Sequence, residues 1–301
     1  MCAFLHKYIT EVFYIRKFIC LTLVLLTLFC VNVSAAPAQV EGFTIPIDVT
    51  VNGDFVKCIS KPYSDGGVTY IPLRSFADIL SAPITWNEED QSATFTKNDV
   101  TFTFYADKPV CLVNGYVCEN GYAQMQNDEI MFIPLRFVCE YLGYTVTWDN
   151  FYYIEDVEAP GNVNPEECKD FSYTRNDLLW LAKINYVECG AESVRTRIGI
   201  ANTVVNRMRS PIYPNNIPDA ITDVKHGVQY PPAHKARFKT VVPSWSSMVA
   251  AKCALNGVEL VGDSVAFVHV NAIHRSWPGT HMNHFTTIGV VAFFTFSPVY
   301  R

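Results

Sequence analysis

The sequence predicts a mixed α+β protein with two domains, a tandem-repeat αβ module followed by a helix-rich α+β domain. The first observation behind this is an internal repeat at a fixed offset of 62 residues. The second is a pair of segments, 177–184 and 193–208, whose apolar residues recur at helical spacing. About 265 residues remain after an apolar start, which suits two domains of ordinary size.

The first 36 residues predict an export signal. Lys7, Arg16 and Lys17 give a basic start, residues 18–33 are apolar, and small residues at 33–36 offer a cleavage site. An uncleaved anchor is the alternative. No later segment is long and apolar enough to span a bilayer. The rest of the chain is therefore expected to be exported and not to cross the membrane.

The repeat defines a module over residues 40–158. Each copy predicts a hairpin with an Asn-Gly turn, a strand, a helix (73–80 and 135–142) and another strand, and a further hairpin covers 92–105. Residues 159–172 contain Pro160, Gly161 and Pro165 without periodicity and predict a linker to the domain at 173–301. The repeated segments are Val51-Asn52-Gly53 and Val113-Asn114-Gly115, 70–74 and 132–136, and Ile84-Thr85-Trp86 and Val146-Thr147-Trp148.

The balance of acidic and basic residues changes at the same boundary between the two predicted domains. Residues 48–158 carry 17 acidic and 6 basic side chains, and residues 166–301 carry 10 acidic and 14 basic ones. A mildly basic second domain suits an anionic polymer such as a bacterial wall, and we expect no nucleic-acid partner. Two unrelated modules with different surfaces would give the same division.

Glu188 is the candidate catalytic residue. It closes the first amphipathic segment of the second domain, just before Gly190, which is placed to end the helix. A carboxyl in apolar surroundings has a raised pKa, which suits a general acid. The alternative is that Glu188 and Glu192 are ordinary carboxylates at helix ends, with no catalytic role. Further on, the sequence predicts a helix from Ser244 to Leu255 and strands at 265–270 and 288–296.

Cysteine and histidine placement gives weaker signals. Seven of the ten cysteines follow the signal, and Cys111 and Cys118 are equidistant from the second Asn-Gly turn, so they should lie opposite each other. A second hypothesis is a cysteine peptidase in which Cys189 is the nucleophile and His269 or His274 is the base. No paired Cys-x-x-Cys or His-Glu-x-x-His motif is present, so we expect no metal and no cofactor.

From Leu181 to Phe294 the chain resembles the catalytic domain of the SleB-type cell wall hydrolases, the spore cortex-lytic enzymes. The resemblance rests on Glu188-x-x-x-Glu192-Ser193, 200–207, Tyr213-Pro214-Asn215, 250–257, Ala266-Phe267-x-x-x-Asn271 and Ile288-Gly289. It implies a lysozyme-like α+β domain with Glu188 as catalytic acid and Glu192 as a second characteristic glutamate. One departure is a missing histidine after Gly289, and another is an insertion in the segment that ends in Gln229 and Tyr230.

Four residues are candidates for binding a sugar polymer. Gln229 and Tyr230 lie in the altered family segment. Asn271 and Trp277 lie in the polar, aromatic connection 271–285, where a Trp face can stack on a pyranose ring.

The repeat module resembles the copper amine oxidase N-terminal domain, because the pattern Pro-Leu-Arg, helix, Val-x-Trp occurs twice. Residues 37–160 contain no histidine, so copper binding through imidazoles is not expected. The module is interpreted as binding the wall or a protein partner, with a passive spacer as the alternative.

The sequence thus predicts a secreted, wall- or spore-associated enzyme that cleaves the bond between N-acetylmuramic acid and N-acetylglucosamine in peptidoglycan. Either a lytic transglycosylase or a muramidase fits, and spore cortex lysis is one setting. The alternatives are a non-catalytic wall-binding protein with a degenerate hydrolase domain and a cysteine peptidase of the wall.

Overall fold

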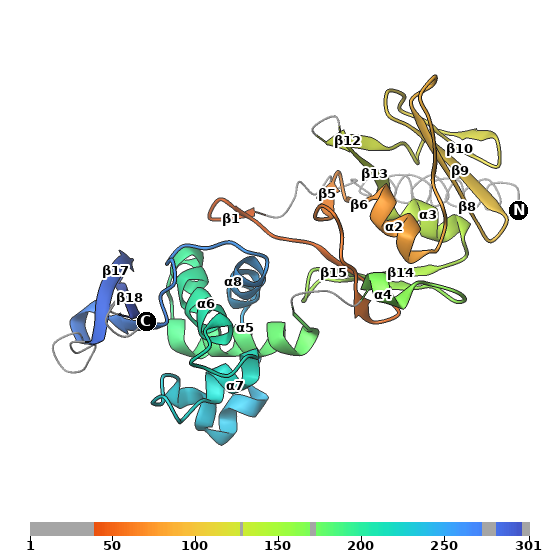
Figure 1. Cartoon of the computed structure of the whole chain (residues 1–301). Coiled ribbons are helices and arrows are strands. Elements are labelled where there is room, and N and C mark those ends of the chain that lie inside the picture. Colours follow the sequence, from red (N-terminus) through yellow and green to blue (C-terminus); the bar gives the residue numbers. More distant parts are fainter. Residues whose placement is uncertain (1–38, 127–128, 169–172, 273–280, 297–301) are drawn as a thin grey trace, which may run out of the picture.

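The computed structural model describes residues 39–126, 129–168, 173–272 and 281–296. Figure 1 shows two lobes, an N-terminal one built of several sheets and a C-terminal one built of helices with a small sheet. The mixed α+β class predicted from the sequence is confirmed. The predicted signal at 1–36 lies outside the described residues, and no described helix has the length and apolarity that a bilayer crossing needs.

The N-terminal lobe follows the repeat closely. Both Asn-Gly hairpins form, as does the predicted hairpin β8–β9, and the predicted helices end within one residue of their expected ends. Its elements are β3 (Asp48–Val51), β4 (Asp54–Phe55), β5 (Tyr63–Asp65), β6 (Val68–Pro72), α2 (Leu73–Ile79), β7 (Thr85–Asn87), β8 (Ser92–Lys97), β9 (Val100–Tyr105), β10 (Cys111–Val113), β11 (Tyr116–Cys118), β12 (Gln124–Gln126), β13 (Ile130–Pro134), α3 (Leu135–Tyr141), β14 (Thr145–Asp149) and β15 (Ile154–Glu158).

The two copies are related by a local pseudo-two-fold axis. In the central sheet, ordered β12-β13-β6-β5, Ile71 pairs with Ile133, and the flanking pairs 72–132 and 70–134 mirror each other. Two further sheets, β11-β10-β9-β8-β7 and β14-β15-β3-β4, extend the lobe, and the second closes by the parallel pair β15–β3. The first and last strands of the module are therefore neighbours.

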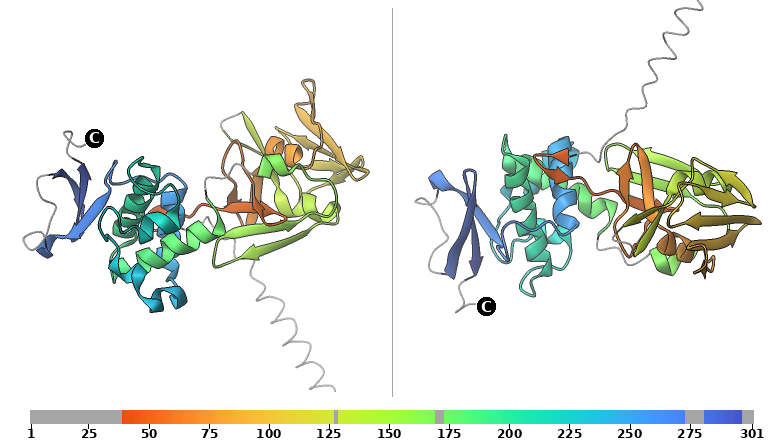
Figure 2. Two further views of the ribbon diagram at one scale, coloured as in Figure 1. Left: turned by 60° about the horizontal axis from the view of Figure 1, so that its bottom comes forward. Right: turned by 90° about the horizontal axis from the view of Figure 1, so that it is seen from above.

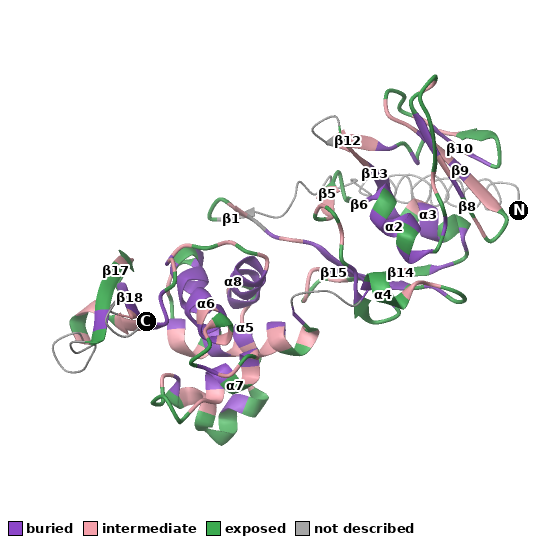
Figure 3. Cartoon of the chain, in the orientation of Figure 1, coloured by how far each residue is buried: buried purple, intermediate pink, exposed green. Residues whose placement is uncertain are grey.

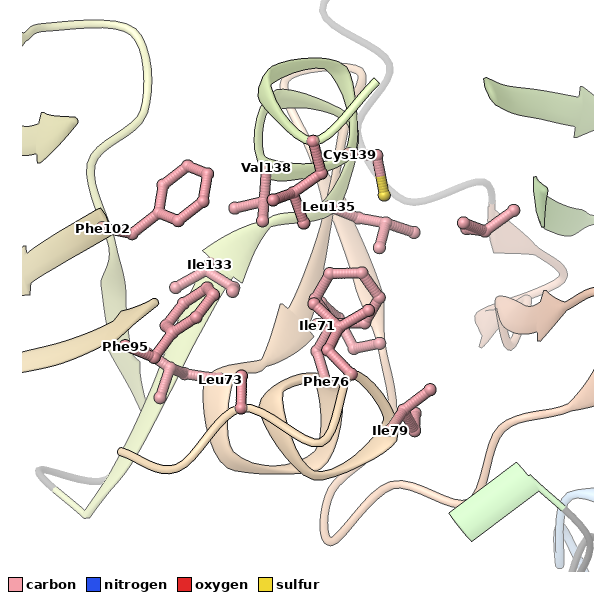
Figure 4. Close-up of a cluster of buried hydrophobic side chains, with 14 of the residues drawn as sticks. Ile71, Leu73, Phe76, Ile79, Phe95, Phe102, Ile133, Leu135, Val138 and Cys139 are labelled. Carbon is pink, nitrogen blue, oxygen red and sulfur yellow. The ribbon is translucent and has the colours of Figure 1, made fainter. Parts of the chain in front are cut away.

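The core of this lobe lies around the axis. Figure 4 shows Phe76 and Val138 projecting from α2 and α3 toward the central strands, where Ile71 and Ile133 lie. Cys139 is fully buried there, at the position that Ala77 occupies in the first copy, and acts as a small apolar residue. Within the predicted linker, the short helix α4 (Pro165–Cys168) packs against the same core through Cys168.

The C-terminal lobe is built on three packed helices. Figure 3 shows α6 and α8 largely buried. Side chains of Thr174, Ser193 and Ser244 cap the starts of α5, α6 and α8, as predicted for Ser244. The elements are α5 (Arg175–Cys189), α6 (Val194–Arg209), α7 (Ile217–Thr222), the 3₁₀ turns η1 (Pro231–His234), η2 (Ala236–Thr240) and η3 (Val270–Ala272), α8 (Trp245–Leu255), β16 (Ala266–His269), β17 (Met282–Ile288) and β18 (Val291–Phe296).

The sheet of this lobe differs from the sequence-based expectation. It has three strands in the order β16-β18-β17, because residues 282–288 form a strand of their own. The predicted single strand 288–296 is wrong: the chain reverses at Gly289, which has a φ of +59°. Glycine tolerates this left-handed conformation, so a tight turn replaces a continuous strand.

The two lobes share buried contacts. Residues before the repeat form the hairpin β1 (Gln39–Val40) and β2 (Phe43–Thr44), and Ile45 just after it packs against Ile198 and Val249 of the helical lobe. Figure 2 shows this hairpin against the helices from above. Lys252 of α8 is fully buried and lies 3.0 Å from the carboxylate of Asp48 in β3. The Lys252 ammonium also donates to the carbonyls of Tyr152 and Tyr153, so its charge is compensated.

Candidate active site

Glu188 lies in the last turn of α5, one residue before the helix ends. Its side chain is half-buried, and its Oε1 atom is buried without a hydrogen-bond partner among the described residues. Burial raises the pKa of this carboxyl from its ordinary 4.5 to about 7. A group with this pKa can both donate and accept a proton near neutral pH, as general acid–base catalysis requires.

The turn after Glu188 is held by Arg197, a buried residue of α6. Its guanidinium donates to the carbonyl of Gly190 at 2.6 Å, to the carbonyl of Glu192 at 3.0 Å and to the Ser247 hydroxyl at 2.9 Å. Gly190 has a φ of +53°, which turns the chain away from the helix axis. The sequence analysis missed Arg197. A charged residue next to Ile198, on a helix with an apolar face, was the available signal.

Glu192 follows this turn and precedes α6, so the two glutamates do not lie on one helix, in agreement with the predicted helix end at Gly190. The Oε2 atom of Glu192 faces the β17–β18 turn: a Cβ added to Gly289 would lie 3.3 Å from it and 3.1 Å from the Thr196 hydroxyl. Gly289 therefore lets the hairpin approach Glu192 closely. This places Glu192 between the α5–α6 turn and the small sheet.

A cavity of about 550 Å³ lies beside the small sheet, over the C-terminal half of α6. Gln229, one of the predicted binding residues, lines it, and its Oε1 atom accepts a hydrogen bond from Arg207 at 3.0 Å. Phe267 also lines the cavity and packs toward Phe293, in the cluster that contains Cys189. The aromatic side chain of Phe267 thus connects the cavity to the end of α5.

Tyr230 is only 1% exposed, so in this structure it supports the wall of the site instead of facing a ligand. Its hydroxyl lies 3.3 Å from that of Thr203, and its ring packs toward Phe267. Burial raises the pKa of the Tyr230 hydroxyl, although the Arg207 charge and the Thr203 hydrogen bond lower it, and the charge of Glu188 makes a smaller contribution that raises it.

Asn271, another of the predicted binding residues, is not brought together with Gln229. Asn271 is exposed in η3, where its backbone N–H donates to His269, and it does not line the cavity. Trp277 lies outside the described residues.

Arg207 is a second residue whose role the sequence analysis missed, although it was part of the quoted 200–207 motif. Arg207 is buried and donates a hydrogen bond to the carbonyl of Val265. Its guanidinium carbon lies 4.6 Å from the ring centroid of Tyr213 and 5.4 Å from that of Tyr230. Its Nη1 atom is buried and has no hydrogen-bond partner within the described ranges. The guanidinium therefore brings a positive charge to the floor of the cavity.

Cys189 lies beside Glu188 but is a poor candidate nucleophile. It is buried, its thiol lies 3.5 Å from the Asn185 side-chain oxygen, and burial raises its pKa to about 12. A reactive cysteine needs a lowered pKa and access to solvent. The parts of the chain that the structure describes hold no group of three or more His, Cys, Asp or Glu side chains that could bind a metal ion.

Residues 50–153 match the copper amine oxidase N-terminal domain, and residues 191–294 match the Cell Wall Hydrolase family. The chain thus carries a copper amine oxidase N-terminal domain followed by a cell wall hydrolase domain. The second match begins three residues after Glu188 and includes Glu192 and Gln229.

Two solved structures are similar to part of the chain. The catalytic domain of the Bacillus cereus SleB protein is 20% identical, with a TM-score of 0.35 over 41% of this chain and 92% of that one. The catalytic domain of the germination-specific lytic transglycosylase SleB from Bacillus anthracis is also 20% identical, with a TM-score of 0.36 over 41% and 97%. No curated protein sequence matches the chain.

Proposed function

We propose that this protein is an exported enzyme that cleaves the glycosidic bond between N-acetylmuramic acid and N-acetylglucosamine in peptidoglycan, at the wall or the spore cortex. The observation that carries the proposal is the half-buried Glu188 carboxyl, whose buried Oε1 atom has no hydrogen-bond partner among the described residues and whose pKa is raised to about 7. In the sequence it lies three residues before the segment that matches the Cell Wall Hydrolase family. Such a carboxyl is protonated often enough at neutral pH to act as an acid.

In the proposed mechanism Glu188 protonates the glycosidic oxygen as positive charge develops at the anomeric carbon of the muramic acid. In the lytic transglycosylase route the 6-hydroxyl of the same sugar attacks that carbon, and Glu188 takes back the proton. The glycosidic C–O bond breaks, an anhydro bond forms, and no water is consumed. One carboxyl therefore serves both steps.

A muramidase route would use water as the nucleophile and calls for a second carboxylate at a defined separation. Glu192 is the residue that would supply it. Glu192 lies in the connection between α5 and α6, beside Gly289, whereas the single-carboxyl route needs only the Glu188 carboxyl. We therefore favour the lytic transglycosylase outcome.

The test compares wild-type protein with Glu188→Gln on purified peptidoglycan, with mass spectrometry of the products. We expect Glu188→Gln to lose cleavage by about 10²–10⁴-fold, the usual worth of general acid–base catalysis. Glu192→Gln is the matched control and should keep part of the activity. Wild-type activity should fall as the pH rises above about 7, because the acid must be protonated.

Anhydro-sugar products support the transglycosylase, and reducing ends support the muramidase. A wild-type protein that binds wall but releases no fragments would support a degenerate, non-catalytic domain. An active Glu188→Gln would refute the glycosidic mechanism.

A further inference from the structure

The pseudo-two-fold axis of the N-terminal lobe creates two equivalent sites, one in each copy of the repeat. In the second copy Arg136 donates to Glu155 Oε1 at 2.7 Å and to the carbonyl of Val146 at 2.8 Å. The Thr69 hydroxyl, which comes from the other copy, donates to Glu155 Oε2 at 3.3 Å. The carboxylate of Glu155 is therefore held from two sides.

Trp148 belongs to the same second-copy site and contacts another aromatic side chain of the chain, although it remains 36% exposed. Its ring and that of Tyr153 pack edge to face, with 5.3 Å between the ring centroids. Tyr153 in turn packs against Trp245 of the helical lobe, with 6.3 Å between the ring centroids. The arginine of the second-copy site is thus closed off by an internal carboxylate, and its tryptophan contacts a tyrosine that packs at the interface between the lobes.

The first copy keeps the arginine and the tryptophan but loses each residue that closes the second site. Arg74 and Trp86 correspond to Arg136 and Trp148 at the offset of 62 residues. At the same offset, the residues that contact the arginine and the tryptophan differ between the two sites. The first-copy site has Ala93 where the second has Glu155, Met131 where the second has Thr69, and Gln91 where the second has Tyr153.

The result of these three exchanges is an open groove of about 490 Å³, lined by Arg74, Trp86, Gln91, Ala93 and Met131 together with other residues of the lobe. In both copies the tryptophan pairs across the strands with the exchanged position, Trp86 with Ala93 and Trp148 with Glu155. The groove therefore occupies the place that the Glu155 side chain fills in the second copy.

The groove has the chemistry of a binding site. Arg74 is exposed, and in the described part of the chain it makes no hydrogen bond or ion pair, while Trp86 is 41% exposed. Asp107 and Glu129 also line the groove and add two carboxylates that can accept from an ammonium group. Met131 adds an apolar surface. A ligand that fits carries a carboxylate for Arg74, an amino group, and an apolar or flat portion for Trp86.

We propose that this groove, defined by Arg74, Trp86, Ala93 and Met131, binds a short peptide with free carboxyl and amino groups, its carboxylate taking the position on Arg74 that Glu155 holds on Arg136. In a wall, the stem peptide of peptidoglycan carries both groups. That choice of ligand rests on the proposed function. The module then holds the enzyme on the peptides of the wall while the helical lobe acts on its glycan.

The test is a calorimetric titration of the full chain with a synthetic stem peptide that has free carboxyl and amino groups. Arg74→Gln should weaken binding by about 10- to 100-fold, since a hydrogen bond to a charged group is lost. The same peptide with amidated carboxyls should bind wild type about as weakly as the free peptide binds Arg74→Gln. Arg237→Gln, which removes an exposed positive charge from the other lobe, is the control and should bind like wild type.

Ala93→Glu gives a second, independent arm. The new carboxylate should pair with Arg74 as Glu155 does with Arg136, so the variant should stay folded and lose peptide binding. Equal binding by wild type, Arg74→Gln and Ala93→Glu, or no binding by wild type, overturns the proposal. If Ala93→Glu unfolds, Arg74→Gln and the amidated peptide still decide it. The peptide contains no glycosidic bond, so its binding can hold or fail independently of glycan cleavage.

Discussion

Replacing Glu188 by Gln should make the stability of the protein less dependent on pH. In the folded chain burial raises the pKa of Glu188 from 4.5 to about 7, so ionising this carboxyl opposes folding. The penalty is absent below about pH 4.5, grows as the pH rises, and is complete above about 7. A pKa difference of this size corresponds to about 3 kcal/mol.

We expect the free energy of unfolding of Glu188→Gln, relative to wild type, to rise by up to about 3 kcal/mol between pH 4.5 and pH 8. The change with pH is the measured quantity, because a buried amide has a pH-independent cost of its own. Denaturant titrations at several pH values, followed by circular dichroism, would measure it. Glu119→Gln reports how much the loss of an exposed carboxylate changes the curve. Parallel curves for wild type and Glu188→Gln would refute the inference that burial controls this carboxyl.

Three further predictions concern residues that take no part in the proposed proton transfer. Cys189→Ser should cleave peptidoglycan at nearly the wild-type rate, since a buried thiol of high pKa has no nucleophilic role; an inactive but folded variant would revive the peptidase alternative. Lys252→Met should lower the free energy of unfolding by about 3–5 kcal/mol in denaturant titrations, because it leaves the buried charge of Asp48 with no positive partner and only the Tyr173 hydroxyl as a donor among the described residues, and adding Asp48→Asn should recover much of the loss. Cys111 and Cys118, which face each other in the hairpin β10–β11, should form a disulfide under oxidising conditions that adds about 1–3 kcal/mol; intact-mass analysis that finds both thiols free after oxidation would contradict this.

Much of the fold was predictable because its signals are local. An Asn-Gly pair fixes a hairpin through the conformations its two residues accept, and the facing of Cys111 and Cys118 follows by counting outward from that turn. The position of Glu188 near the end of a helix followed in the same way, from apolar spacing and Gly190. These features depend on neighbours within a few residues, which the sequence displays directly.

The small sheet and the substrate contacts were less predictable. Strand β17 lies in a polar stretch whose pairing depends on β18, so its alternation gave little signal. Tyr230 looks like a binding residue in sequence, yet packing against Thr203 and Phe267 buries it. Burial is a property of the assembled lobe and not of residue type.

By itself, then, the sequence determined the repeat and a glutamate at a helix end, and it predicted a division into two domains. Tertiary structure alone decided that Arg197 holds the turn beside this glutamate, and that Asp48 and Lys252, about two hundred residues apart, share a buried ion pair. It also decided that two equal copies differ in use, one closed by Glu155 and one left open at Ala93. The physical reason is that charge compensation and cavity shape depend on which distant side chains meet, and chain spacing does not encode those meetings.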